Sequence, residues 1–270
     1  MLDFGISQSV LFNADMASDL DMACEAGFSH FAPLDQMVHR TRLAETIRLL
    51  RDRPLTVSSY HTGLMVAEML EAEADARLRQ EIEAAAALGA PVLVVCPGSA
   101  GALSSYDAET VLITRLQKVG RLARELGVVI GIEPLHPFLH ASSFVHTLRD
   151  TARIAAQVES CGVVLDVTHL YWDRQLLDDI AEHIDAICLV HLANLDQQAL
   201  QERRWQRGAL DGDIVPVAAL VSAIHNAGYR GAYENEIIAR QSVDDSRDAA
   251  AASRIWFERL WQSGTVEGKA

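Results

Sequence analysis

The feature that most constrains the fold is a regular alternation of short apolar segments with longer amphipathic ones. Eight short segments are rich in apolar and β-branched residues, as buried strands are. Between them, apolar residues recur at the spacing of one helix face, which is typical of successive βα units. The eight strand candidates are FGIS (4–7), SHFAPL (29–34), LTVSSYH (55–61), PVLVVC (91–96), VVIGIE (128–133), GVVLDV (162–167), AICLVH (186–191) and AYENEI (232–237).

Glycines punctuate this alternation. They stand directly after helical segments and within a few residues of the next strand, and glycine readily takes the left-handed conformation that closes a helix. Eight strands, each followed by a helix, predict a (β/α)8 barrel, or TIM barrel, with the last helix near 243–262 and one domain spanning 1–270. A doubly wound open sheet is the competing fold, but no Gly-x-Gly-x-x-Gly follows the first strand. The glycines are Gly27, Gly89, Gly127, Gly162 and Gly228.

The charge of the chain narrows the choice of partners. Its 270 residues carry 37 acidic and 23 basic side chains, which gives a formal net charge of -14. Such a surface repels phosphate backbones, so we expect no nucleic-acid partner. No run approaches the ~18 to 20 apolar residues of a membrane span, and the first residues lack the features of a secretory signal. We therefore expect a cytoplasmic protein that has no membrane partner and acts on a small molecule.

Ligand-type side chains end four consecutive strand candidates. Glu133, Asp166, His191 and Glu236 stand at the ends of the fifth to eighth strands. In a TIM barrel these ends converge on one mouth, where three carboxylates would repel one another unless a cation held them. A lone acid at a strand end is usually a solvated loop residue, but four on consecutive strands predict a divalent metal site. Oxygen ligands with one nitrogen suit Mn²⁺, Mg²⁺, Co²⁺ or a catalytic Zn²⁺.

Lysine is scarce, and this excludes one common type of barrel enzyme. The chain has two lysines, Lys118 and Lys269. Lys118 falls in an exposed-looking helical segment and Lys269 in the C-terminal tail. A Schiff-base aldolase needs a lysine that points into the barrel from a strand, so imine chemistry is not expected.

Four motifs follow one another in the second half of the chain. In this order they resemble the xylose-isomerase-like superfamily of TIM barrels, in particular its sugar phosphate isomerase/epimerase members. The resemblance implies that the four strand-end residues bind one divalent metal, and that Glu133 and Glu236 act as acid and base on opposite faces of a carbohydrate substrate. The motifs are GIEPLHP (131–137), VVLDVTHLYWD (163–173), ICLVHLANLD (187–196), and RGALDGDI with AGYRGAYENEI (within 207–237).

The implied chemistry is proton transfer next to a carbonyl. A metal that holds a carbonyl and the neighbouring hydroxyl acidifies the C–H between them, and a nearby carboxylate can move that proton. Return of the proton to the other face is epimerisation, whereas return to the adjacent carbon is isomerisation. The same site could instead expel a β-hydroxyl or β-glycosidic oxygen, which would make the protein a lyase of the inosose dehydratase or keto-glycoside type. A barrel that only binds a ligand or partner is a third interpretation.

Further residues are candidates for substrate binding. His169 fits the family's Asp-x-x-His pattern, in which the histidine reaches substrate oxygens. His136 follows Glu133 where relatives carry Asn or His, and His61 ends the third strand, so either could bond substrate hydroxyls. Trp172 could offer an apolar platform to a sugar face. The alternatives are a loop-capping His169, a structural His61 and a Trp172 that packs only against a neighbouring loop.

One arginine is a candidate for the substrate mouth. In similar proteins an arginine at the position of Arg207 faces the substrate, and it would pair with an anionic group. Arg203 and Arg204 are rivals for this role. Glu234 shares a strand face with Glu236 and could also point into the barrel, but the ligand glutamate of the family falls at Glu236.

The chain departs from two branches of this superfamily. AP endonucleases use extra histidines to assemble three zinc ions, whereas the fourth strand here ends in Cys96. Ketose 3-epimerases tend to carry a second glutamate where this chain has Leu139. We therefore do not expect this chain to bind free ketohexoses in the way that they do. Relatives often form dimers or tetramers, and the resemblance therefore allows a homo-oligomer.

Overall fold

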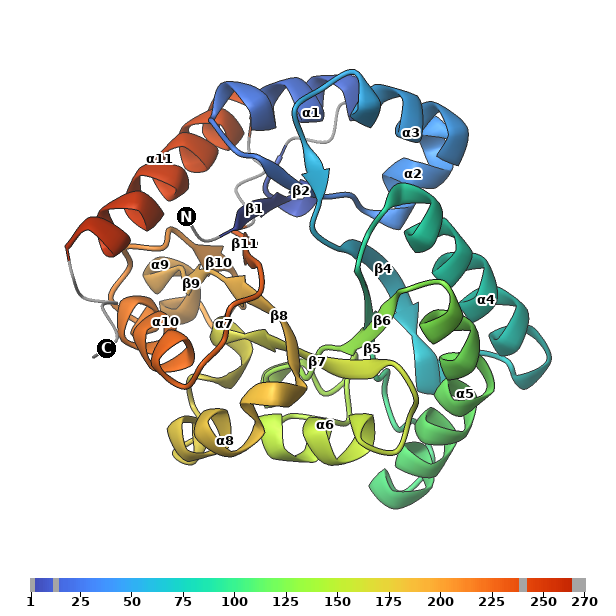
Figure 1. The fold of residues 1–270 in the computed structure, drawn as a ribbon. Helices are drawn as coiled ribbons and strands as arrows, with labels where there is room; N and C mark the ends of the chain where they lie inside the picture. The colour runs from blue at the N-terminus through green and yellow to red at the C-terminus, as the bar shows by residue number, and fades with distance from the viewer. Residues whose placement is uncertain (1–2, 12–14, 238–241, 264–270) are drawn as a thin grey trace.

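Parallel strands form the central sheet, and helices surround it (Figure 1). The computed structural model describes residues 3–11, 15–237 and 242–263, and nine strands of these residues make up the sheet. The strands are β1 (Phe4–Ser7), β2 (His30–Ala32), β3 (Thr56–Val57), β4 (Tyr60–Met65), β5 (Val92–Cys96), β6 (Val129–Ile132), β7 (Cys161–Asp166), β8 (Ile187–Leu192) and β11 (Tyr233–Asn235). They lie in the order β3-β2-β1-β11-β8-β7-β6-β5-β4.

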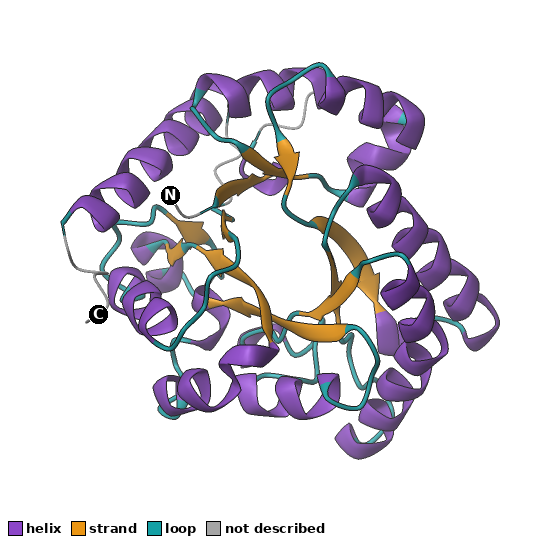
Figure 2. Cartoon of the chain, in the orientation of Figure 1, coloured by secondary structure: helices purple, strands orange, loops and turns teal. Residues whose placement is uncertain are grey.

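The helices form a ring outside the strands (Figure 2). The long ones are amphipathic and bury their apolar face against the sheet, so the main core lies between strands and helices. The α-helices are α1 (Met16–Glu25), α2 (Asp35–Thr41), α3 (Leu43–Arg51), α4 (Glu71–Leu88), α5 (Ser105–Glu125), α6 (Leu148–Ala155), α7 (Val167–Leu170), α8 (Leu176–His183), α9 (Gln197–Gln201), α10 (Val217–Asn226) and α11 (Val243–Gln262). Short 3-10 turns are η1 (Gln8–Val10), η2 (Val66–Glu68), η3 (Pro137–Leu139) and η4 (Ile184–Ala186).

The third barrel strand differs from its prediction. The sequence predicts one strand over 55–61, whereas the structure divides it into β3 and β4 and extends β4 to Met65. The amide of Ser58 bonds the carbonyl of Phe31, and the amide of His61 bonds that of Pro33. Between these bonds the ladder lacks a donor, because Pro33 has no N–H. A parallel bridge from Leu34 to His61 then closes the sheet into a barrel.

Most of the predicted helix-closing glycines lie where expected. Gly27, Gly89, Gly127 and Gly228 all have positive φ angles. The prediction for Gly162 is wrong: it lies inside β7, and the residue with positive φ at this turn is Ser160. A Cβ at Gly162 would stand 3.0 Å from the carbonyl oxygen of Ala186, so here glycine allows close packing instead of closing a helix.

A small antiparallel ribbon sits beside the barrel and carries one of the candidate residues. It pairs β9 (Asn194–Leu195) with β10 (Arg207–Gly208), with Arg207 opposite Leu195. The Asn194 side chain fastens the following loop, since its amide nitrogen donates to the carbonyls of Gly212 and Val215. The ribbon therefore fixes where the backbone of Arg207 stands relative to the mouth.

The predicted fold class, a (β/α)8 barrel, is confirmed. The carboxyl ends of β5 to β8 and β11 meet at one end of the closed sheet, which is where TIM barrels place their functional residues. None of the helices in the described parts of the chain is long and apolar enough to span a membrane.

The inside of the barrel is packed closely around a glycine. Val92, Val94, Val164 and Leu189 form their own apolar cluster. A Cβ on Gly131 of β6 would lie 2.6 Å from the Cγ2 atom of Val164 and 2.9 Å from Cγ1 of Val92. Neighbouring strands thus fill the space that a side chain at Gly131 would need, and the barrel holds a core instead of a pore.

We expect Gly131→Ala to lower the free energy of unfolding by about 1–3 kcal/mol, because an added methyl group overpacks this closed interior. Urea denaturation measures the change. Gly63→Ala is the matched control, since it also lies in a strand but is exposed and would meet only Asp35 Oδ2 at 3.9 Å. Equal stability of the two variants would contradict close packing inside the barrel.

Candidate metal centre

Four side chains from adjacent strands converge at the carboxyl end of the barrel. Glu133 directly follows β6, Asp166 ends β7, His191 is the penultimate residue of β8, and Glu236 directly follows β11. These strands are neighbours in the order β11-β8-β7-β6. One ligand atom from each residue lies within 4.8 Å of the others. The structure thus brings together all four residues that the sequence singles out.

His191 lies between the two glutamates. Its Nδ1 atom is 2.9 Å from Glu133 Oε1 and 3.0 Å from Glu236 Oε2, and the ring is fully buried. Burial alone would lower the pKa of His191, but Glu236 and Glu133 outweigh it and raise the pKa well above its usual value. Burial likewise opposes ionisation of Glu236, yet Arg207 and His191 hold the pKa of this carboxyl well below its ordinary value. Glu236 is therefore a carboxylate at neutral pH.

Arg207 offsets the negative charge of two of these carboxylates, Asp166 and Glu236. Its guanidinium donates to Asp166 Oδ2 at 2.5 Å through Nη2 and to Glu236 through Nη1. The residue is 8% exposed. Burial would lower the pKa of Arg207, but the carboxylates of Asp166 and Glu236 raise it, so the guanidinium stays charged. The rival arginines, Arg203 and Arg204, are exposed.

His169 joins this network from α7. Its Nε2 atom lies 3.1 Å from Nη2 of Arg207 and 3.7 Å from Asp166 Oδ2. Burial lowers the pKa of His169 even though Asp166 opposes the shift, so the neutral ring accepts the Arg207 hydrogen bond. The indole N–H of Trp172 donates to the carbonyl of His169 at 2.8 Å and braces this turn. The predicted roles of His169 and Trp172 toward substrate stay predictions.

Aromatic rings form a layer that contacts His169. We call His136, Phe138, Trp172 and Trp205 the aromatic layer. The His136 ring lies 4.6 Å from Trp205 and 5.8 Å from Trp172, and Phe138 stacks on Trp205 at 6.1 Å. Phe138 is 56% exposed and Trp172 39%. Burial lowers the pKa of His136 to about 4, and the nearby His169 adds to the effect, so the layer carries no charge at neutral pH.

Two members of the aromatic layer do not follow from the sequence analysis. Trp205 stacks on His169 at 5.5 Å as well as on its partners in the layer. Its only sequence signal is an aromatic residue two positions before Arg207, and Phe138 likewise follows His136 by two. Such spacing does not reveal that the two loops meet in space.

A second buried group lies below the carboxylates. His61 places Nε2 2.9 Å from Glu234 Oε2, and its Nδ1 atom lies 3.7 Å from Glu236 Oε1. Glu234 also accepts a hydrogen bond from the hydroxyl of Ser59 at 3.1 Å, and lies 3.3 Å from Nε2 of His191. Glu234 thus points into the barrel, as strand alternation predicts. His61 is nearly buried at 6% exposure, and its role toward substrate stays a prediction.

Other reactive groups are excluded from this centre. Cys96 is not among the described residues whose ligand atoms converge here, and burial, with Glu133 next to it, raises the pKa of its thiol. Lys118 lies exposed on α5, and Lys269 lies outside the described residues. No lysine of the described chain therefore reaches the mouth for imine chemistry.

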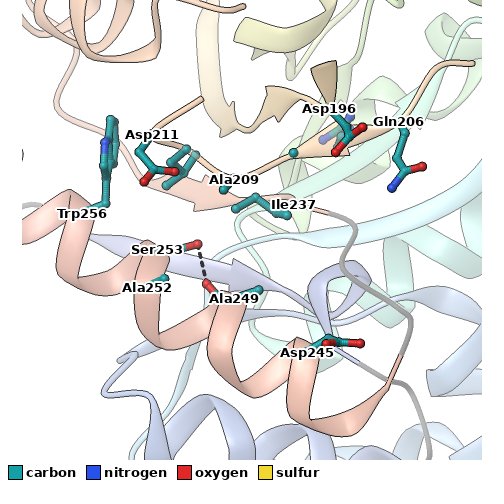
Figure 3. Close-up of a pocket in the computed structure, with 13 residues that line it drawn as sticks. Asp196, Gln206, Ala209, Asp211, Ile237, Asp245, Ala249, Ala252, Ser253 and Trp256 are labelled. Carbon is teal, nitrogen blue, oxygen red and sulfur yellow. Dashed lines mark hydrogen bonds between the residues drawn. The ribbon is translucent and has the colours of Figure 1, made fainter. Parts of the chain in front are cut away.

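A cavity of about 580 Å³ lies between α11 and the β9–β10 ribbon (Figure 3). Arg207 forms part of its wall, but the guanidinium is already paired with Asp166 and Glu236. The carboxyl-bearing residues Asp196, Asp211 and Asp245 also line the cavity. An anionic group would meet more negative than positive charge here, so this cavity does not suit a phosphate.

A comparison with protein families shows which family the chain belongs to. The family described as xylose isomerase-like TIM barrel matches residues 20–260. The chain belongs to this family. None of the curated proteins compared with it matches.

Solved structures of this xylose isomerase-like fold resemble the chain over nearly its whole length. Protein SMc04130 from Sinorhizobium meliloti 1021 has a TM-score of 0.83 and 25% identity, covering 94% of this chain and 98% of its own. A D-allulose 3-epimerase from Methylomonas sp. has a TM-score of 0.80 and 18% identity, covering 96% and 98%. The IOLI protein with a bound zinc atom has a TM-score of 0.78 and 14% identity, covering 98% of each chain. The latter two similarities show the shared fold.

In this xylose isomerase-like barrel, we expect Arg207→Met to lower the free energy of unfolding by about 3–5 kcal/mol in the presence of a chelator. The substitution leaves the buried carboxylate of Asp166 without its counter-charge and leaves Glu236 with His191 alone. Urea denaturation in EDTA measures the loss. Arg204→Met is the control, because its guanidinium pairs with exposed Glu202 and such surface pairs contribute about 0–1 kcal/mol. Equal effects of the two substitutions would contradict a charge-balancing role for Arg207.

Proposed function

We propose that the protein is a divalent-metal-dependent isomerase or epimerase of a sugar-like substrate with a carbonyl next to a hydroxyl. The observation that carries this proposal is the convergence of one imidazole and three carboxylates, with ligand atoms within 4.8 Å of one another. Two structural relatives support it: one D-allulose 3-epimerase structure contains D-allulose, and the IOLI structure contains zinc.

The residues fit an ion by their chemistry. Glu133, Asp166, His191 and Glu236 supply three carboxylates and one imidazole nitrogen, a set that suits Mn²⁺, Mg²⁺, Co²⁺ or catalytic Zn²⁺. Two buried carboxylates and one partly buried carboxylate so close together need positive charge beyond Arg207, which His191 supplies in this structure and an ion would supply when bound. When bound, the ion would polarise the substrate carbonyl and stabilise negative charge that develops on its oxygen.

The two glutamates are suited to proton transfer. Glu236 is ionised, which is the form that accepts a proton from carbon. Its Oε2 atom is engaged by Arg207 and His191, and this leaves Oε1 as the oxygen that exchanges the proton. Glu133 approaches from β6, at the other end of the four-strand arc. It takes a proton from solvent and delivers it to the opposite face, while Glu236 releases to solvent the proton that it removed. Epimerisation requires this two-sided arrangement.

The remaining candidates shape the substrate site. His169 is neutral and offers a hydrogen bond. Arg207 keeps Glu236 ionised and holds the carboxylates of Asp166 and Glu236 in place. The aromatic layer is uncharged and partly exposed, so it suits the apolar face of a sugar ring. Because the charge of Arg207 is already balanced by two carboxylates, an unphosphorylated sugar or cyclitol fits better than a sugar phosphate.

We expect the protein, incubated with Mn²⁺ or Co²⁺ in deuterated water, to place deuterium on a carbon next to the carbonyl of its substrate. The proton delivered to carbon comes from a glutamate that has exchanged it with solvent, so the product carries solvent deuterium. Mass spectrometry and NMR of product and recovered substrate measure the uptake across a panel of keto-sugars, sugar phosphates and inososes. Glu133→Gln and Glu236→Gln should each reduce turnover by about 10²–10⁴-fold, the usual contribution of a general acid or base.

Glu202→Gln is the control for these substitutions, because Glu202 is an exposed glutamate that pairs with Arg204. Its turnover should equal that of the unmodified protein. A product lighter than its substrate by water or an aglycone would show that the same site catalyses β-elimination instead of isomerisation. Absence of deuterium in every product and recovered substrate would contradict the proposed proton transfer.

A further inference from the structure

One buried carboxylate has no role in the function proposed above. Glu234 on β11 is fully buried inside the barrel, and its strand register places it opposite His191 of β8. Its strand neighbour β1 makes room for it with a glycine, because a Cβ on Gly5 would lie 3.3 Å from Glu234 Cγ. A charged side chain at this depth is costly unless it has partners, so its contacts indicate its purpose.

The contacts of Glu234 centre on two imidazoles. Its Oε2 atom lies 2.9 Å from His61 Nε2 and 3.3 Å from His191 Nε2, and it accepts a hydrogen bond from Ser59. Two imidazole nitrogens and a hydroxyl thus face one oxygen of Glu234, and a carboxylate oxygen can accept hydrogen bonds from such groups.

The two nitrogens of His191 face different groups. Nδ1 faces Glu133 and Glu236 at the mouth. Nε2 is buried and makes no hydrogen bond in the described parts of the chain, and it lies 3.3 Å from Glu234 Oε2. An ion at the mouth needs the lone pair of Nδ1. The single proton of the neutral ring must then sit on Nε2, the atom that faces Glu234.

We propose that Glu234 is a positioning residue of the metal centre: it accepts the Nε2 proton of His191 and so keeps the Nδ1 lone pair aimed at the ion. This inference rests on the proposed function, since it requires an ion at the four-residue centre. A carboxylate that holds the outer nitrogen of a ligand histidine fixes the tautomer and ring orientation and raises the basicity of the ligand atom. His61 and Ser59 in turn hold Glu234 in place.

The same side-chain atoms could instead bind a second metal ion. Nitrogens of His61 and His191 and an oxygen of Glu234 also lie within 4.8 Å of one another. Two ions would require His191 to lose both ring protons, whereas one ion and one hydrogen bond leave the ring neutral. The single-ion arrangement therefore fits the chemistry of imidazole better, and the number of ions bound distinguishes the two.

The test is a titration of the apoprotein with Co²⁺ alone, followed by its visible absorption. We expect one Co²⁺ per chain in the unmodified protein. Glu234→Gln should bind the same number about 10–100-fold more weakly, as is usual when such a carboxylate is removed. Glu81→Gln is the matched control, because Glu81 is a fully buried glutamate on α4 that bonds Tyr60 and His39. It should keep the Co²⁺ affinity of the unmodified protein.

A second measurement reports on the hydrogen bond itself. In the Co²⁺ protein, the Nε2 proton of His191 should give a paramagnetically shifted NMR signal that disappears in deuterated water. Because Glu234 holds this proton, its exchange should be slow in the unmodified protein and faster in Glu234→Gln. A residue that only supports the fold would not change this exchange rate, and the spectrum of the unmodified protein is informative even if the variant does not fold.

The outcomes separate the two proposals. Failure of the unmodified protein to bind Co²⁺ would overturn the proposed function and this inference with it. One bound ion with the same affinity in Glu234→Gln, or no protected Nε2 proton in the unmodified protein, would overturn the positioning role alone. Two ions per chain, one of them lost in Glu234→Gln, would also overturn it and make Glu234 a ligand.

Discussion

The mutual repulsion of three carboxylates at the mouth of the barrel is the constraint on which the rest of the site depends. Glu133, Asp166 and Glu236 are brought within a few ångströms of one another in a largely buried setting. Arg207 and His191 supply the positive charge in this structure, and an ion would supply it in a loaded enzyme. The arrangement therefore costs stability, and under the proposed function that cost holds the proposed acid, base and metal ligands together, as is common in functional sites.

The barrel provides this arrangement because its strands are parallel and closed. Four adjacent strand ends bring the four side chains to one place. Because alternate residues of a strand share a face, the residue two positions before each of them also faces the barrel interior. Below Glu236 on the same face of the β11 segment is Glu234, which meets the inner nitrogen of His191. The charged residues at the mouth are thus followed, deeper in the barrel, by the hydrogen-bonded pair His61 and Glu234 and then by the apolar cluster around Val164.

The sequence predicts those parts of the molecule that depend on local patterns. The strands and helices follow from periodicity, and the convergence of the four strand-end residues follows from the rule that parallel strands end at one mouth. Features set by contacts between distant segments could not be predicted. The partners of Arg207 depend on the β9–β10 ribbon, the position of Trp205 depends on a meeting of two loops, and the break in the third strand depends on the register of Pro33. Gly162 shows the same limit, since helix-closing and close-packing glycines look alike in a sequence.

The most direct test of the account is the anomalous scattering of a crystal of the protein grown with Co²⁺. The account predicts one strong peak per chain, at bonding distance from carboxylate oxygens of Glu133, Asp166 and Glu236 and from Nδ1 of His191. Nε2 of the same ring should face Glu234 at hydrogen-bonding distance. A peak between His61, His191 and Glu234, or no peak while Arg207 still joins Asp166 to Glu236, would contradict the central claim that these four residues form a metal centre.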